Sequence, residues 1–197
     1  KLQTIDLTDN ALTVKGRDAL AEFKVFNLIR ARLSEDGNKL DLSNLGIGDV
    51  ECKCIAECED LKDLTHLYLE LNKITDKGIA HLASSEYLKN VTLLSLDRNK
   101  IGDEGFIHII KSETLQNIQV LMVENAGITD EGINVICEEE CMKNLLRLYI
   151  EENDTTEEGL ELLAEPEHLQ QLEYPEFDRE EEIEEEEEEE EEFEDVE

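Results

Sequence analysis

The sequence predicts an α/β solenoid, an arc in which a parallel β-sheet lines the concave side and helices cover the convex side. Three observations support this fold class. An apolar anchor recurs every 27 residues from Leu40 to Leu148, residues around each anchor alternate in polarity as in a strand with one buried side, and the stretch that follows has helical spacing. Such an array buries its core between neighbouring coils, so its function is expected on an extended surface.

The strand comes first in each repeat. The anchors are Ile5, Leu40, Leu67, Leu94, Leu121, Leu148 and Leu172. The second residue after each anchor is again apolar or aromatic, namely Leu7, Leu42, Leu69, Leu96, Val123, Ile150 and Tyr174. Because every copy turns the same side inward, these two columns predict about six to seven repeats of 27 residues.

A short amide follows the strand in most repeats. The fifth residue after the anchor is Asn10, Asn72, Asn99 or Asn153, and Leu45 and Ala126 interrupt the column. An amide at this place can bond the backbone polar groups that a turn leaves unpaired. The column is therefore predicted to be a stacked structural ladder rather than a set of ligands.

The helix is the last element of each repeat. Equivalent aspartates precede it, and each is predicted to be the helix N-cap, with its carboxylate near the positive end of the helix dipole: Asp49, Asp76, Asp103 and Asp130. Core positions at helical spacing follow at Ile79, Leu82, Ala83, Phe106, Ile109, Ile110, Ile133, Ile136 and Cys137. Leu88, Leu115 and Met142 are expected to close the helices against the next strands.

The two ends of the chain depart from this regular pattern. The step from Ile5 to Leu40 is 35 residues, which predicts a longer first helix. Because the chain begins inside a strand motif, we expect residues 1–177 to be an N-terminally truncated repeat domain whose last partial repeat caps the C-terminal end. Residues 178–197 contain 16 acidic side chains and one arginine, so this polyglutamate tail is expected to be disordered.

The repeat pattern resembles the leucine-rich repeat family. The segments NKITDKGIAHLA, NKIGDEGFIHII and AGITDEGINVIC are similar to its ribonuclease-inhibitor-type branch, which also includes the activating protein of the small GTPase Ran. The resemblance covers roughly residues 1–177. It implies a scaffold for binding protein partners, because this family presents surfaces to many different proteins.

Composition limits the classes of partner and the cellular compartment. A net charge of −34 argues against direct binding of nucleic acid or anionic lipid. No apolar stretch approaches the ~20 residues that are needed to span a bilayer. Five cysteines, an odd number without a regular framework, indicate a reducing compartment, the cytosol or nucleus.

Metal binding and catalysis find little support in the sequence. Cys52, Cys54 and Cys58 follow a CxCxxxC spacing, but Cys52 falls in the core column of the helices. Cys54, His81 and His108 occupy equivalent places on successive helices, about 8 to 10 Å apart, which is too far for shared coordination. The segment from Asp97 to His108 mimics a calcium loop but has Ile101 where an oxygen ligand is required. There is no phosphate loop, GxSxG or HExxH motif, so we expect no catalytic residue, no metal and no cofactor.

The outward strand positions carry the candidate binding site. Tyrosine and methionine side chains one residue after the anchor are expected beside carboxylates three residues after it, and Arg98 lies next to them. The predicted partner-binding residues are Tyr68, Glu70, Asp97, Arg98, Met122, Glu124, Tyr149 and Glu151. Aromatic anchors flanked by aligned acids predict docking of a basic protein, and the tail would accelerate the encounter by long-range attraction.

Other functions remain open at this stage. The resemblance to the Ran-activating protein implies GTPase activation, for which Arg98 is the basic residue to test. An array followed by an acidic tail also resembles, in layout, the acidic nuclear proteins that bind histones. A further alternative is an effector-type repeat protein that is delivered into a host cell and engages a host protein.

Overall fold

The computed structural model describes residues 13–138 and 142–172, which form one row of coils. Five parallel strands make a single sheet in the order β1-β2-β3-β4-β5, and their bounds are β1 (Lys39–Asp41), β2 (His66–Tyr68), β3 (Leu93–Ser95), β4 (Val120–Met122) and β5 (Arg147–Tyr149). Each strand residue pairs with the residue 27 positions further along, as Leu40 does with Leu67 and Leu121 with Leu148. The sheet therefore has no stagger, and equivalent residues lie in straight rows across the strands.

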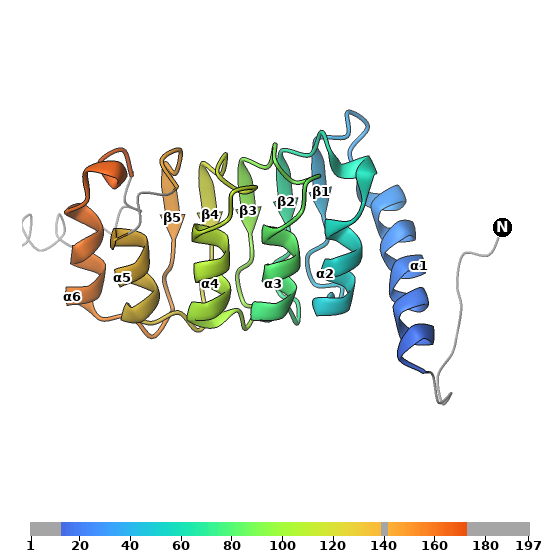
Figure 1. The fold of residues 1–197 in the computed structure, drawn as a ribbon, viewed down its shortest axis with the longest axis horizontal. Coiled ribbons are helices and arrows are strands. Elements are labelled where there is room, and N and C mark those ends of the chain that lie inside the picture. Colours follow the sequence, from blue (N-terminus) through green and yellow to red (C-terminus); the bar gives the residue numbers. More distant parts are fainter. Residues whose placement is uncertain (1–12, 139–141, 173–197) are drawn as a thin grey trace, which may run out of the picture.

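The helices form a second layer that runs along the sheet (Figure 1). Their bounds are α1 (Val14–Arg32), α2 (Asp49–Ala56), α3 (Asp76–Ala83), α4 (Gly102–Ile110), α5 (Asp130–Glu138) and α6 (Glu157–Glu161), and single 3₁₀ turns lie at η1 (Glu59–Leu61), η2 (Leu162–Ala164) and η3 (Glu167–Leu169). We name the coils by residue range: coil I (38–64), coil II (65–91), coil III (92–118), coil IV (119–145) and coil V (146–172). The predicted α/β solenoid of parallel strands and covering helices is confirmed.

The described residues hold five coils, compared with the six to seven predicted along the whole chain. The predicted strand around Ile5 lies outside the described residues, as do Tyr174 and the tail at 178–197. Helix α1 has 19 residues, compared with eight in α2, so the longer first helix is confirmed. It packs Val25 and Ile29 into the core at the coil I end of the row.

The core is a continuous strip between sheet and helices. All five described anchors from Leu40 to Leu148 are at most 2% exposed. Phe106 is the largest fully buried side chain and lies in the middle of the strip. Cys52 is fully buried as its column predicted, whereas Cys137 is only half-buried, because the next helix along the row, α6, has only five residues.

The predicted asparagine ladder joins coils II, III and V to the coil that precedes each of them. In coil II, Asn72 Nδ2 donates to the Leu42 and Leu69 carbonyls at 2.9 and 2.8 Å, and its Oδ1 accepts from the Leu45 and Ile47 N–H groups at 3.1 and 2.9 Å. Equivalent bonds are made by Asn99 and Asn153. The amide of coil II thus provides the hydrogen bonds that the turn of coil I needs. Coil I can therefore carry Leu45 at its own position in the asparagine column.

The prediction that the aspartates are N-caps is wrong. The N-cap of α3 is Thr75, and Asp76 is the first helical residue. Asp49, at the start of α2, instead sends its carboxylate across to α3, where it accepts from Thr75 N at 2.9 Å, Thr75 Oγ1 at 2.8 Å and Gly78 N at 3.0 Å. The aspartate bonds the next coil because neighbouring parallel helices begin side by side. The carboxylate of one helix therefore reaches the unpaired N–H groups at the start of the next.

This aspartate ladder repeats at two further junctions and is missing at one. Asp103 bonds Thr129 and Gly132, and Asp130 bonds Thr156. Asp76 has no counterpart to bond, because Gly102 replaces the threonine in coil III. Among the described residues, junctions I/II and IV/V therefore carry both ladders, II/III carries only Asn99, and III/IV carries only Asp103, since Ala126 replaces asparagine in coil IV.

Candidate functional site

The outward face of the sheet consists of three straight rows that cross the strands. We define the upper row as Lys39, His66, Leu93, Val120 and Arg147, the aromatic row as Asp41, Tyr68, Ser95, Met122 and Tyr149, and the acidic ridge as Glu70, Asp97, Glu124 and Glu151. The ridge is aligned because the turn backbones also pair, with Arg98 N bonding the Glu124 carbonyl and Asn125 N bonding that of Glu151. Seven of the eight predicted site residues lie in the aromatic row or the acidic ridge.

The aromatic row offers partly exposed rings and a thioether on a rigid support. Tyr68, Met122 and Tyr149 are each partly exposed, and the small Ser95 between the first two is fully buried. Lys39 Nζ lies 4.8 Å from the centre of the Tyr68 ring. Tyr68 therefore already holds one cation over its face, an arrangement that aromatic rings favour.

The acidic ridge is held in place by hydrogen bonds from the strands beneath it. Asp97 Oδ1 accepts from the Glu124 N–H at 2.8 Å, and Ser95 Oγ donates to Glu70 Oε2 at 2.6 Å. Within the described part of the chain, Glu151 Oε2 is buried and has no hydrogen-bond partner. The ridge therefore combines fixed carboxylates with an unsatisfied acceptor.

Like charge and burial both act on this ridge. Burial raises the pKa of Asp97 above its usual value, and the Glu70 and Glu151 carboxylates add to the rise, while the bond from Glu124 N opposes it. Burial also raises the pKa of Glu124, followed by the charges of Asp97, Glu151 and Glu152. These carboxylates are ionised at neutral pH only at an electrostatic cost to the folded state.

We expect Asp97→Asn to stabilise the protein at about pH 7 by about 0.5 to 1 kcal/mol, the scale of cross-strand charge interactions. The raised folded-state pKa means that the ionised form is disfavoured in the folded state. Stability linked to Asp97 is therefore present below its unfolded pKa and lost as the pH rises through its folded pKa. Urea unfolding at about pH 7 and pH 4 measures this, and the gain should vanish at the lower pH.

The control for this experiment is Glu131→Gln, which removes one charge from the exposed side of α5, away from the ridge. Because Glu131 lies in the first turn of α5, this variant should not raise the urea midpoint at either pH and should lower it slightly at about pH 7. An equal gain in both variants would show that relief of net charge, not of the ridge, is responsible.

Arg98, the eighth predicted residue, lies one position beyond the ridge, in the turn that follows β3. Its backbone has a φ of 55°, and the equivalent residues of the other coils share this left-handed conformation: Asn44, Leu71, Asn125 and Glu152. Its guanidinium lies 4.0 Å from Glu152 Oε2. Arg98 therefore borders the ridge with its charge directed to an acid two coils away.

The cysteine and histidine positions on the helix side lie apart. Cys54 Sγ donates to the Val50 carbonyl at 3.3 Å, and burial, followed by the charges of Glu22 and Glu57, raises its pKa to about 11. His81 and His108 are exposed. Over residues 13–138 and 142–172, no three potential ligands converge on a common point.

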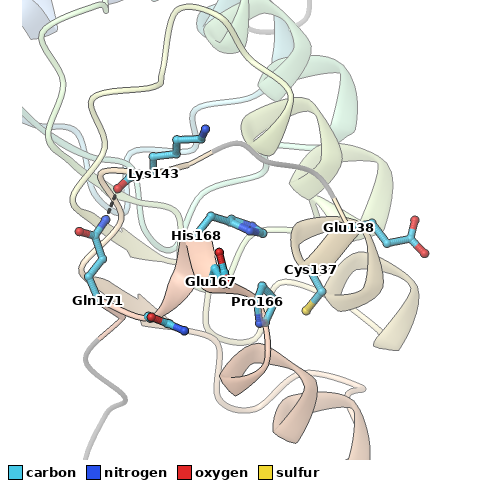
Figure 2. Close-up of a pocket in the computed structure, with 8 residues that line it drawn as sticks. Cys137, Glu138, Lys143, Pro166, Glu167, His168 and Gln171 are labelled. Carbon is cyan, nitrogen blue, oxygen red and sulfur yellow. Dashed lines mark hydrogen bonds between the residues drawn. The ribbon is translucent and has the colours of Figure 1, made fainter.

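An open pocket lies near the C-terminal end of the described chain (Figure 2). Its volume is about 730 Å³, and it is lined by Cys137, Glu138, Lys143, Pro166, Glu167, His168, Gln170 and Gln171. His168 is engaged with the Ile136 carbonyl at 3.0 Å, and Gln171 donates to the Lys143 carbonyl. Figure 2 shows Glu138 directed away from the other labelled side chains, and Cys137 Sγ donates to the Leu162 carbonyl at 3.4 Å.

Comparison with known proteins gives the fold class a name. Residues 1–21, 61–83 and 87–107 match the family described as Leucine Rich repeat. Together with five in-register coils, these matches show a leucine-rich repeat fold, which is generally used as a scaffold for protein interaction and is typically not catalytic. No helix in the described part is both long and apolar enough to cross a membrane.

Two solved structures illustrate the likeness. A leucine-rich repeat protein of Leptospira interrogans is 28% identical, with a TM-score of 0.40 over 61% of this chain and 27% of that one. An internalin of Listeria monocytogenes is 21% identical, with a TM-score of 0.38 over 64% of this chain and 37% of that one. The chain thus spans 27% and 37% of the lengths of these proteins. No curated protein sequence matches it.

Proposed function

We propose that this chain is a non-enzymatic scaffold that binds a positively charged protein segment on the aromatic row and acidic ridge. The observation that carries the proposal is the alignment of four carboxylates on adjacent strands beside Tyr68, Met122 and Tyr149. Lysine or arginine side chains would face the ridge, and their apolar neighbours would cover the rings. Interfaces combine these features, with aromatic and methionine anchors at the centre and charge complementarity around them.

The electrostatics of the ridge favour a cationic partner. Asp97 and Glu124 have raised pKa values because burial and like charges disfavour their ionised forms. A lysine or arginine placed between them offsets this repulsion, so part of the cost present in the free protein is recovered on binding. The same charges disfavour an anionic partner such as nucleic acid.

The ridge and the tail have different roles in this proposal. The ridge provides specific contacts at fixed positions, whereas the acidic residues of 178–197 add long-range attraction that raises the association rate. Long-range attraction is screened by salt over about 8 Å at physiological ionic strength. Salt should therefore slow association more than it weakens the completed complex.

The pull-down that tests this proposal uses the full chain in cytosolic and nuclear extracts over a salt series. Tyr68→Ala with Tyr149→Ala should release the partner, while Tyr87→Ala, at a half-buried tyrosine off the concave face, should retain it. The matched charge pair is Glu124→Gln on the ridge and Glu131→Gln on α5. If the ridge and control variants retain the same proteins at the same salt concentrations, the concave face is not the binding site.

The identity of the captured protein decides between the narrower readings. A small GTPase would support the ribonuclease-inhibitor-type branch and a role in GTPase activation, in which case Arg98→Ala should reduce the activated hydrolysis rate. A histone or another basic nuclear protein would support a chaperone-like scaffold, and a host protein an effector. The cysteine usage favours the cytosol or nucleus, so extracts of both compartments are tested.

A further inference from the structure

We propose that the occupant of the concave face is an amphipathic α-helix that lies across the strands, with basic residues over the acidic ridge and apolar residues over the aromatic row. This inference rests on the proposed function and specifies the shape of the partner element. Three observations carry it: the spacing of the ridge, the separation of the ridge from the aromatic row, and the placement of positive charge in the upper row.

The spacing along the ridge matches the repeat of a helix. Neighbouring strands lie about 4.8 Å apart, and because the sheet has no stagger, Glu70, Asp97, Glu124 and Glu151 follow one another at this spacing. A helix presents one side chain per turn on a given face, every ~5.4 Å. The mismatch is about 0.6 Å per strand and stays below about 2 Å over the ridge, within the reach of flexible lysine and arginine side chains.

An extended segment fits this ridge less well. Its side chains on one face recur every two residues, about 6.7 Å apart, so the mismatch grows by about 2 Å per strand. Over three steps it exceeds the separation of two strands. An extended partner crossing the strands could therefore align with only two neighbouring carboxylates, whereas a helix of about three turns aligns with four.

The distance between the aromatic row and the acidic ridge also suits a helix. The aromatic row lies two residues before the ridge on each strand, a displacement of about 6.7 Å along the strand. A helix about 10 Å across carries adjacent stripes about 100° apart at a similar separation. One stripe therefore meets the carboxylates while the next meets Tyr68, Met122 and Tyr149.

The upper row orients this helix. Leu93 and Val120, in the middle of that row, are partly buried and extend the apolar surface. Lys39, at one end of this row, is an exposed cation that repels a basic stripe placed on that side. The basic stripe of the partner must therefore face the carboxyl ends of the strands, where the ridge lies.

The test measures the binding of three labelled peptides of identical composition to the full chain by fluorescence anisotropy. The first has lysines spaced i, i+4, i+7 and i+11, each followed by a leucine, with two prolines at its C-terminal end, so a folded helix carries adjacent stripes. The second moves the two prolines to the centre and so interrupts the helix. The third permutes the residues to alternate lysine and leucine, which favours an extended amphipathic segment.

We expect the first peptide to bind at least about tenfold tighter than the other two, and to lose about tenfold with Glu124→Gln or Tyr149→Ala but not with Glu131→Gln or Tyr87→Ala. Equal binding of all three peptides, weakened alike by the concave-face variants, overturns the helical occupant but leaves the proposed function standing. Binding that no concave-face variant weakens overturns both. Circular dichroism of each variant establishes that it is folded before binding is measured.

Discussion

Replacement of Asn99 by alanine is expected to lower the free energy of unfolding by about 3 to 5 kcal/mol, because it leaves several buried backbone groups unpaired. Asn99 is 2% exposed. Its Nδ2 donates to the Leu69 and Leu96 carbonyls at 2.9 and 2.8 Å, and its Oδ1 accepts from the Ile74 N–H at 3.0 Å. Each unpaired buried group costs about 1 to 3 kcal/mol.

The position of Asn99 in the array adds to this effect. Junction II/III lacks the aspartate ladder because Gly102 follows Ile101 where coils II, IV and V have threonine. Of the asparagine and aspartate ladders described above, this junction therefore has only Asn99 within the described chain. Since a solenoid is stabilised by contacts between neighbouring coils, weakening one junction should also reduce the cooperativity of unfolding.

Urea unfolding followed by circular dichroism measures both consequences. Asn117→Ala is the matched control, since this exposed asparagine makes one cross-coil bond, from Nδ2 to the Lys89 carbonyl at 2.7 Å. The control should cost about 1 kcal/mol or less. Similar losses for the two variants would contradict the view that the inner amides pair buried backbone.

Periodicity explains why so much of the fold could be predicted from the sequence. A column that recurs every 27 residues identifies residues in equivalent environments, so the apolarity of Leu40, Leu67 and Leu94 indicates a shared buried place. The same reasoning identifies the asparagine ladder, since a polar residue that recurs at the repeat spacing beside a turn has unpaired backbone groups to bond.

Periodicity does not show which neighbour a side chain contacts. Asp49 was assigned to its own helix, but its carboxylate bonds Thr75 in the next coil, because the lateral offset of two helices is not encoded in the spacing. A second asparagine ladder, Asn90, Asn117 and Asn144, was missed although it has the same period. Its members lie two residues after Leu88, Leu115 and Met142, and no sequence signal separates an exposed asparagine that bonds the preceding coil from one that is only solvated.

In the candidate site, too, the sequence predicts which face a residue lies on but not which neighbours it contacts. The rows were predictable because alternate strand residues share a face, and Tyr68, Met122 and Tyr149 lie where the pattern placed them. The bond from Ser95 to Glu70 and the burial that raises the pKa of Asp97 depend on neighbouring strands at close range. Arg98 borders the ridge as expected, but its approach to Glu152 could not be predicted, since the left-handed turn at this column accepts residues as different as Asn44 and Leu71.

The second large effect is expected for Asp103→Ala, which should lower the free energy of unfolding by about 2 to 4 kcal/mol. The Asp103 carboxylate accepts from Thr129 N and Thr129 Oγ1 at 2.8 Å each and from Gly132 N at 3.1 Å. The Thr129 N–H, directly before α5, is one of the end groups that a helix leaves unpaired, whereas the Gly132 N–H also donates to the Thr129 carbonyl at 3.0 Å. Junction III/IV also lacks the asparagine ladder, because Ala126 stands at that position.

The array contains its own control for this substitution. Asp76 occupies the same column at the start of α3, but the next coil has Gly102 in place of threonine, and no cross-coil bond to Asp76 is found in the described residues. Asp76→Ala removes the same charge from the same helical position and should cost about 0.3 to 1 kcal/mol, the value of a carboxylate at a helix N-terminus. Equal losses in the two variants would assign the whole effect to the helix dipole.

Gly132→Ala tests the same contact sterically. A Cβ at Gly132 would lie 2.8 Å from Asp103 Oδ1, 3.0 Å from Ile128 Cγ2 and 3.1 Å from Phe106 Cδ1. Alanine is favoured over glycine inside a helix by about 1 kcal/mol, yet here it should destabilise, because the carboxylate must withdraw from the N–H groups that it bonds. In an Asp103→Ala background the penalty should shrink by about 1 to 2 kcal/mol, since the carboxylate is already absent. Strict additivity of the two substitutions would instead assign the cost to Ile128 and Phe106, and glycine at this position would then reflect packing of the helix on its own core rather than access for the neighbouring aspartate.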